Sequence, residues 1–364
     1  MFDCCCSQKD LHTINANINK ALRQTKRNQH QEIKVLLLGA GESGKTTFIK
    51  QLKIILTAHA GKQGFTLSER QRYKETININ LYSIVKDLSK GMQKLEIPFE
   101  HEENKKFGDE ILALKISEIQ LPITEEFLAS VNKFWNDEGI QKCFSKSNKI
   151  QVLDCCHYFM THCSTFADAG YVPTNQDIIW SRYQTTGVLE YKFNIMGSRF
   201  TFIDVGGQRN ERRKWLHSFE GCTTAIFFAA IGDYDLTLRE TAKSNNRVLE
   251  SVKLFEFLIS AESLSKAAFV VFLNKKDKLI EKWETSDIDD YIPQYINWRR
   301  ENHKEKSIET CEEFIIDMFK QYIPMNRDVF FFFTVTTDTD IVSAVFDSVK
   351  STVLKNTLQD LNLA

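Results

Sequence analysis

Two glycines, a lysine and a threonine are spaced in one octapeptide as phosphate binding requires. Residues 39–46 read Gly-Ala-Gly-Glu-Ser-Gly-Lys-Thr and match the pattern G-x-x-x-x-G-K-[ST]. Gly41 and Gly44 let backbone N–H groups curl round an anion, and Lys45 adds a point charge. A helix predicted to begin near Thr46 aims its positive end at the phosphates, and the hydroxyl of Thr46 can bind magnesium. The octapeptide therefore predicts a site for a nucleoside triphosphate.

The alternative interpretation of this octapeptide is a glycine turn between a strand and a helix. The flanking sequence favours the phosphate loop, because a β-branched apolar run, residues 33–38, precedes it and a helical apolar period follows it. That period consists of Phe48, Ile49, Leu52, Ile55 and Leu56.

A second segment whose residues could bind ligand or take part in catalysis is Asp204-Val205-Gly206-Gly207-Gln208, which follows the apolar run 200–203. It is expected at the carboxyl end of a strand, where open α/β sheets hold ligands. Asp204 can hold magnesium through water, Gly207 can bring an N–H group to a terminal phosphate, and Gln208 can orient an attacking water. A plain Gly-Gly surface turn is the alternative.

The third segment, Asn274-Lys275-Lys276-Asp277, also follows a predicted strand, residues 269–273. A carboxylate at this place can accept two N–H donors from the edge of guanine, which adenine does not offer. Asp277 would then set base choice, while Asn274 ties loops together and Lys275 covers the ring. Taken alone, four such residues are usually a charged turn. Residues 334–339 lie where a second loop contacting the base is expected.

Arg182 and Thr185 stand in a fourth segment, Ser-Arg-Tyr-Gln-Thr-Thr-Gly at 181–187. A guanidinium that reaches the γ-phosphate neutralises charge developing in the transition state, and a nearby threonine hydroxyl can complete a magnesium shell. Without the other segments, Arg182 would be read as an ordinary surface arginine.

The spacing of apolar residues predicts the helices and strands that position these segments. Residues 66–172 show helical periods, including 77-81-84-85-88 and 111-114-116-119, and no strand-like alternation. Short β-rich runs separated by helices follow, at 191–195, 200–205, 224–231, 268–273 and 329–335. This alternation predicts a mostly parallel sheet covered on both faces. One α/β domain, residues 33–62 and 178–364, would be interrupted by an all-helical domain at 66–174. The charged stretch 299–313 is expected to be an irregular surface insertion.

Composition excludes several classes of protein. The 364 residues are 42% hydrophobic and 26% charged, as in an ordinary soluble protein. The net charge of -1 shows no surplus of basic residues, so nucleic-acid binding is not expected. No apolar run is long enough to cross a bilayer, and no signal-peptide core is present. These features predict a protein of the cytosol or of the inner face of a membrane.

The nine cysteines are an odd number without C-x-x-C pairs, so neither a disulfide framework nor a zinc site is expected. Six are predicted to be reduced packing residues. Cys4, Cys5 and Cys6 are candidates for palmitoylation, the alternative being an unmodified chain tip. A basic amphipathic helix should follow them, with its apolar residues at 11, 14, 18, 21 and 22. It could lie on an anionic membrane, dock a partner or cover the core.

Together these residues resemble the α subunit of a heterotrimeric G protein nearly from end to end. The motifs at 39–46, 182–187, 204–215 and 274–277 occur in the family's order, with its helical insertion before the arginine. The resemblance implies a Ras-like P-loop GTPase domain with a mostly parallel six-stranded sheet and an inserted all-α domain. It also implies a GTP-hydrolysing switch at the cytoplasmic face of the plasma membrane.

The resemblance assigns roles to individual residues. Gln208 would position water, Arg182 would be a built-in arginine finger, and Glu42 would pair with Arg182 once the γ-phosphate has gone. Mg²⁺ would be held by Thr46 and Thr185, and through water by Asp204. The residues implied to bind GTP or GDP are Gly41, Glu42, Ser43, Gly44, Lys45, Thr46, Thr47, Asp154, Arg182, Thr185, Gly207, Asn274, Lys275, Asp277 and Thr336.

Within the family, the Gq class is the most similar, on residues 53–55, 95–100 and 186–193 and on the cysteine cluster after Phe2. The family also implies partners. These are a βγ dimer at the amphipathic start and at Lys214-Trp215, a seven-helix receptor at residues 340–364, an effector enzyme of phospholipase C type, GTPase-activating regulators and a membrane surface.

Departures from the family pattern matter as well. Thr336 stands where the family has alanine and should crowd the base, so that GDP leaves sooner. Phe2 replaces the glycine that myristoylation requires. Trp180 replaces an arginine and residues 161–165 replace an Asn-Asp-Leu-Asp-Arg run, which puts contacts that clasp the nucleotide in doubt. Leu361 replaces the cysteine that toxins modify, so ADP-ribosylation is not expected.

Two rival functions come from other classes. A phosphate-loop kinase or ATPase would share residues 39–46, but residues 274–277 argue against it. A scaffold that binds nucleotide with little turnover is the other, and both Arg182 and Gln208 argue against it.

Overall fold

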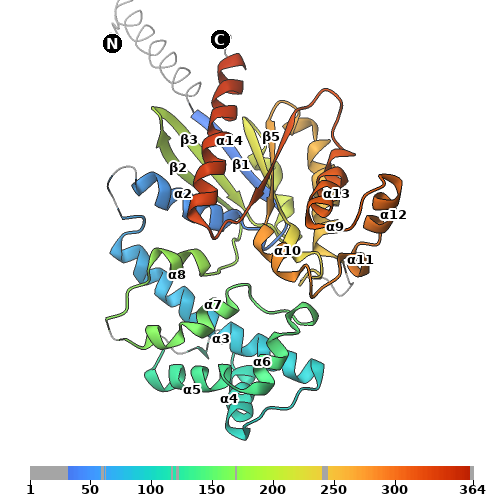
Figure 1. Cartoon of the computed structure of the whole chain (residues 1–364). Coiled ribbons are helices and arrows are strands. Elements are labelled where there is room, and N and C mark those ends of the chain that lie inside the picture. The colour runs from blue at the N-terminus through green and yellow to red at the C-terminus, as the bar shows by residue number, and fades with distance from the viewer. Residues whose placement is uncertain are drawn as a thin grey trace, which may run out of the picture.

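The computed structural model describes residues 32–360 apart from 59–60, 62, 116–117, 120–122, 169 and 240–244. Six strands form one sheet in the order β2-β3-β1-β4-β5-β6 (Figure 1). Their bounds are β1 Glu32–Gly39, β2 Val188–Ile195, β3 Ser198–Val205, β4 Thr224–Ala230, β5 Ala268–Asn274 and β6 Val329–Thr334. Strands β2 and β3 pair antiparallel, and every other pair in the sheet is parallel. The predicted mostly parallel, six-stranded sheet is confirmed.

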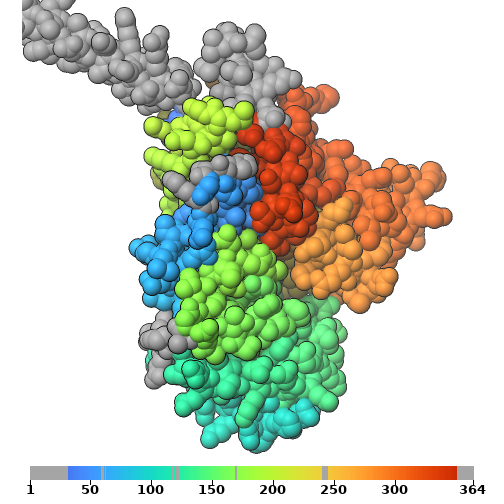
Figure 2. All heavy atoms as spheres, turned by 60° about the vertical axis from the view of Figure 1, so that its left-hand side comes forward, coloured from blue at the N-terminus to red at the C-terminus, as the bar shows by residue number. Residues whose placement is uncertain are grey.

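Helices cover both faces of the sheet. Helices α2 (Lys45–Ala58) and α14 (Thr339–Asp360) pack together on one face, and α9 (Arg247–Ile259) and α13 (Ile308–Lys320) lie on the other. Side chains of β1 alternate between the two cores, with Val35 and Leu37 in the first and Leu36 and Leu38 in the second. Figure 2 shows the red α14 segment lying beside the blue α2 segment.

Phe48 holds the first turn of α2 against the sheet. Its ring is fully buried and lies between 5.4 and 6.4 Å from the rings of Phe202, Phe228, Phe272 and Phe346. Rings from strands β3, β4 and β5 and from α14 therefore fix the position of the loop 39–46 just before this helix.

The helices between α2 and β2 have a core of their own, built round the 29-residue α3. We call the part from α3 to the short helix η3 the helical half, and the sheet with its helices the sheet half. The helical half contains α3 Leu67–Leu95, α4 Glu102–Ala113, α5 Glu125–Trp135, α6 Glu138–Phe144, η2 Ser147–Lys149, α7 Cys156–Thr161 and η3 Cys163–Ala167, and α8 Asn175–Trp180 leads back. Its described residues contain no strand.

The remaining short helices all belong to the sheet half. They are η4 Arg212–Ser218, η5 Ile231–Asp233, η6 Glu262–Leu264, α10 Lys276–Lys282, α11 Ile288–Tyr291 and α12 Gln294–Glu301. Among the residues that the structure describes, no helix is long and apolar enough to span a bilayer.

Two expectations about local structure are wrong. The apolar period 111–119 is not one helix, because α4 ends at Ala113 and Leu114 has an extended backbone, with its carbonyl bound by Lys86 of α3 at 2.6 Å. The stretch 299–313 is not irregular: it contains the end of α12 and the capped start of α13, where Ser307 forms a capping box and Cys311 is buried. The end of α4 thus coincides with a long-range contact from Lys86, and the start of α13 is set by the helix cap at Ser307.

The six described cysteines are free thiols, five of them buried and Cys222 half-buried, as predicted. Cys4, Cys5 and Cys6, the amphipathic segment after them and Leu361 lie outside the described residues.

A buried lysine joins α2 to the end of α8. The ammonium group of Lys50 donates hydrogen bonds to the carbonyls of Ile178 (2.8 Å) and Ser181 (2.5 Å) and lies near the rings of Tyr73 and Tyr183. These partners carry no negative charge. Burial therefore lowers the pKa of Lys50 from its ordinary value of 10.5 to about 7.

This pKa predicts how stability depends on pH. Between about pH 7 and pH 10 the unfolded chain holds more protons on Lys50 than the folded protein does, so the free energy of unfolding rises with pH in this window. Lys50→Met should remove that rise, and the difference in unfolding free energy between the protein and the variant should change by about 2 kcal/mol from pH 7 to 9. Denaturant titrations at several pH values measure it, and parallel profiles for the two proteins would contradict it.

Candidate functional site

The loop between β1 and α2 encloses the ammonium group of Lys45. This group donates hydrogen bonds to the carbonyls of Gly39 (2.9 Å) and Ala40 (2.8 Å). Burial lowers the pKa of Lys45 to about 8, and the nearby carboxylate of Asp204 opposes that shift. Because the first N–H groups of α2 also lack partners within the helix, the loop concentrates positive charge at one point of the structure.

Two glycines in this region admit no side chain. A Cβ atom at Gly207 would lie 2.4 Å from the ammonium nitrogen of Lys45 and 2.5 Å from the carbonyl oxygen of Ala40. Gly44 has φ +105°, and a Cβ there would lie 2.2 Å from the amide nitrogen of Asn274. The backbone after β3 therefore approaches the backbone of the loop closely, and the side chain of Asn274, at the end of β5, packs against the loop at Gly44.

Three oxygen-bearing side chains from distant segments meet beside the loop. The hydroxyl of Thr46 donates to Oδ2 of Asp204 at 2.7 Å and lies 2.8 Å from the hydroxyl of Thr185. Oδ1 of Asp204 is buried and has no hydrogen-bond partner in the described part of the chain, and burial raises the pKa of this carboxyl group.

This donor set fits a magnesium ion. Mg²⁺ prefers hard oxygen ligands, is held by few protein groups and keeps several waters. The unpartnered oxygen of Asp204 and the two hydroxyls, of Thr46 and Thr185, supply such a set. Within the described ranges no cluster of three or more His, Cys, Asp or Glu side chains forms an alternative metal site.

Asn274 ties three segments together, as its sequence position predicts. Its amide nitrogen donates to the carbonyl of Ser43 (2.8 Å) and to the hydroxyl of Thr336 (3.0 Å). Its amide oxygen accepts from the hydroxyl of Thr334 and from the backbone N–H of Thr336. The phosphate loop and the segment after β6 are thus fixed to the end of β5.

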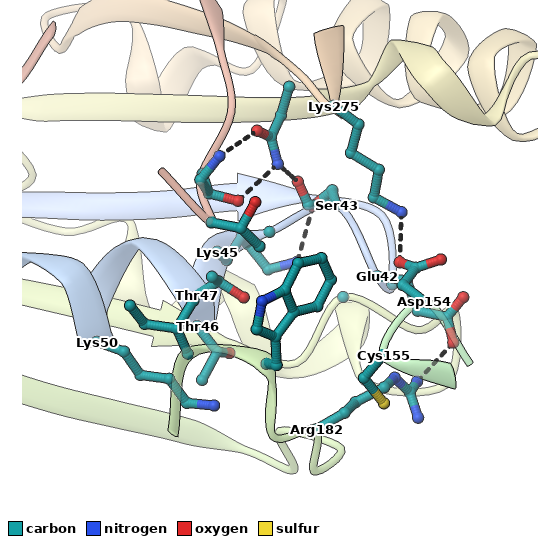
Figure 3. A pocket seen from close by; sticks show the side chains of 18 of the residues that line it. Glu42, Ser43, Lys45, Thr46, Thr47, Lys50, Asp154, Cys155, Arg182 and Lys275 are labelled. Atoms are coloured by element: carbon teal, nitrogen blue, oxygen red, sulfur yellow. Dashed lines mark hydrogen bonds and ion pairs between the residues drawn. The ribbon is translucent and has the colours of Figure 1, made fainter. Parts of the chain in front are cut away.

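Arg182 is held by its backbone and by its side chain. Asn80 of α3 accepts from the backbone N–H of Arg182 (2.7 Å) and donates to its carbonyl (2.6 Å). The guanidinium forms an ion pair with Glu42 at 2.7 Å, which is the pair that the family resemblance implies (Figure 3).

Glu42 is also the centre of a larger ionic network. Arg247 lies 2.7 Å and Arg239 lies 3.4 Å from its carboxylate, and these arginines together hold its pKa low despite burial. Beside it, Lys275 pairs with Asp154 of the helical half at 2.7 Å (Figure 3). Lys275 also pairs with Asp233 at 3.0 Å. The network connects the two halves across the cavity.

Gln208 lies at the edge of the same cavity. Its side-chain oxygen accepts a hydrogen bond from Gln184 at 2.6 Å. Gln184 precedes Thr185, so one short segment contacts both the oxygen cluster and Gln208. A water placed between Gln208 and an anion at Lys45 would have an acceptor ready to orient it.

The structure brings nearly all predicted site residues to one cavity between the two halves (Figure 3). Asp204 is fully buried behind Thr46. Lining the cavity are Gly41, Glu42, Ser43, Gly44, Lys45, Thr46, Thr47, Asp154, Arg182, Thr185, Gly207, Gln208, Asn274, Lys275, Asp277 and Thr336.

Sequence reasoning missed several residues that shape this site. Arg239 and Arg247 follow the end of β4, so the rule that ligand groups follow strand ends could have suggested them. Asn80 and Lys50 had one available signal, a polar side chain on the apolar side of a helix. Gln184 had none, because its role depends on the position of Gln208.

The cavity combines the cationic phosphate loop, an oxygen cluster that suits a divalent cation, the guanidinium group of Arg182 and the side-chain amide of Gln208, which can orient water. This combination suits transfer of a phosphoryl group to water.

Comparison with known families agrees with this chemistry. Residues 12–353 match the family model of the G-protein alpha subunit, which is nearly the whole chain. Proteins of this family are in general GTPases that bind guanine nucleotides and act in signal transduction. The chain belongs to the G-protein alpha subunit family.

Proposed function

We propose that this protein is a GTP-hydrolysing molecular switch that couples seven-helix receptors to intracellular effectors as part of a heterotrimeric G protein. One observation carries the proposal: Thr46, Thr185 and Asp204, from three distant segments, meet within hydrogen-bond distance beside Lys45. A shared cation and phosphate group would explain why these segments converge.

Each of the cavity residues would have a separate role in GTP hydrolysis. Lys45 and the amides of the loop bind the phosphates, while Thr46, Thr185 and, through water, Asp204 would hold Mg²⁺, which when bound neutralises phosphate charge. Arg182 exchanges Glu42 for the γ-phosphate, and Gln208 orients the attacking water. Asp277, which lines the cavity, recognises guanine. Hydrolysis then releases the segments that carry Arg182 and Gln208, which changes the affinity for partners.

The finer assignments follow from the sequence. We assign the chain to the Gq class on residues 53–55, 95–100 and 186–193, with a phospholipase C-type enzyme as effector. A βγ dimer would bind the amino-terminal helix and the segment at Lys214-Trp215, a receptor would bind α14, and GTPase-activating regulators would act on the cavity edge. The boundaries proposed are 1–32 for the amino-terminal amphipathic helix with its acylation cysteines, 33–62 with 178–364 for the Ras-like GTPase domain, and 66–174 for the inserted helical domain.

The first test of this function is Gln208→Leu. Loss of the water-orienting amide should lower the rate of single-turnover GTP cleavage by about 100-fold or more, with GTP affinity retained. Gln321→Leu, which does not line the cavity, is the control and should cleave GTP at the normal rate. Equal cleavage by Gln208→Leu and the unaltered protein would leave a nucleotide-binding scaffold as the better description.

Thr336 provides a test of nucleotide release. Its side chain is buried, lines the cavity and accepts a hydrogen bond from Asn274. If its bulk crowds the base, Thr336→Ala should slow dissociation of GDP by about tenfold. Thr336→Val keeps the bulk and loses the hydroxyl, so it should release GDP as fast as the unaltered protein. The hypothesis fails if the alanine variant and the unaltered protein have the same GDP dissociation rate.

Membrane attachment is expected to depend on Cys4, Cys5 and Cys6. Several acyl chains hold a protein on a bilayer where a single chain is marginal, and Phe2 leaves no site for myristate. Replacement of all three cysteines by serine should move the protein from the plasma membrane fraction to the cytosol. Full membrane retention of this variant would rule out acylation at these positions.

A further inference from the structure

Arg239 contacts both halves of the molecule. It follows β4 and η5 in the sheet half, and its Nη1 donates a hydrogen bond to Asp87 of α3, in the helical half, at 3.3 Å. Its Nε lies 3.4 Å from the carboxylate of Glu42 in the phosphate loop. The side chain of Arg239 is 25% exposed and that of Asp87 is 20% exposed, so water screens the pair only in part.

The three arginines round Glu42 are not equivalent. Arg247 is buried and fixed by a second carboxylate, Asp233, at 2.9 Å, and Arg239 is fixed by Asp87. Among the described residues, Arg182 forms no ion pair with a second carboxylate, and its side chain is 31% exposed. When Arg182 turns to another anion, Arg239 and Arg247 keep the buried carboxylate of Glu42 paired, which avoids the cost of an isolated buried charge.

Residues of both halves line the cavity. Gly41 to Thr47 line it from the sheet half, and Asp154 and Cys155 line it from the helical half. A nucleotide that fills this cavity contacts both halves, so movement of the halves away from each other would ease its release. That movement separates α3 from the phosphate loop and so breaks the contact between Arg239 and Asp87.

We propose that Arg239 is a positioning residue that clasps α3 to the phosphate loop through Asp87 and Glu42 and thereby slows the release of guanine nucleotide. The kinetic part of this inference rests on the proposed function. The clasp itself is a contact between two halves of the chain and can be tested without nucleotide.

A double-mutant cycle on GDP release isolates the clasp. Asp87→Asn removes the cross-half charge and leaves Glu42 with all three arginines, whereas Arg239→Gln removes both contacts. Each single variant should release a fluorescent GDP analogue about three to ten times faster than the unaltered protein. The double variant should release it no faster than the faster single variant, because both changes break one contact.

The chain offers a matched control pair. Arg299 and Asp289 lie 2.7 Å apart and are 18% and 19% exposed, and neither lines the cavity. Arg299→Gln should leave the release rate unchanged. Rates in Arg239→Gln and Asp87→Asn equal to that of the unaltered protein would overturn the clasp while leaving the proposed function intact.

A second measurement does not depend on nucleotide. Labels introduced through unnatural amino acids at the exposed positions Glu126 in α5 and Lys320 in α13 report the distance between the halves. Arg239→Gln and Asp87→Asn should shift this distance distribution to longer values, and Arg299→Gln should not. Unchanged distributions in both would overturn the clasp, even if the protein bound no GDP and the proposed function had failed.

Discussion

The burial of one positive charge organises this molecule. The ammonium group of Lys45 lies inside a loop whose own carbonyls are its hydrogen-bond acceptors, and burial lowers its pKa to about 8. Holding a cation there costs free energy unless an anion is close. Asp204 partly compensates this charge, and a phosphate group would complete the compensation. The glycines at 44 and 207, which leave no room for a Cβ atom, let the side chain of Asn274 and the backbone after β3 approach the loop closely at this point.

A second constraint is that the cavity belongs to neither half alone. Glu42, Asp233 and Lys275 come from the sheet half, and Asp154 and Asp87 come from the helical half, yet they form one network of ion pairs. Such partly buried networks specify geometry more than they add stability, because desolvation offsets much of the attraction. In this protein the geometry they specify is the closed arrangement of the two halves over the phosphate loop.

The sheet and the chemical segments could be predicted because their signals are local. A strand appears in the sequence as an apolar run. Such a run precedes each of the three segments 39–46, 204–208 and 274–277, so all three are expected at the carboxyl ends of parallel strands of one sheet. The end of α4 could not be predicted, since Lys86, 28 positions away, takes up the carbonyl of Leu114. The same holds for Arg239 and Asp87, whose pairing joins positions 152 apart in sequence and depends on how the halves pack.

Recognition of guanine in the cavity at Lys45 is the central claim, and comparison of GDP with ADP tests it most directly. Titration calorimetry of the purified protein with each nucleotide and Mg²⁺ measures both affinities under one condition. We predict tight binding of GDP and an affinity for ADP that is lower by about 100-fold or more, because a site built to hydrogen-bond one edge rejects a base that lacks it. Equal affinities, or no binding of either nucleotide, would contradict the claim.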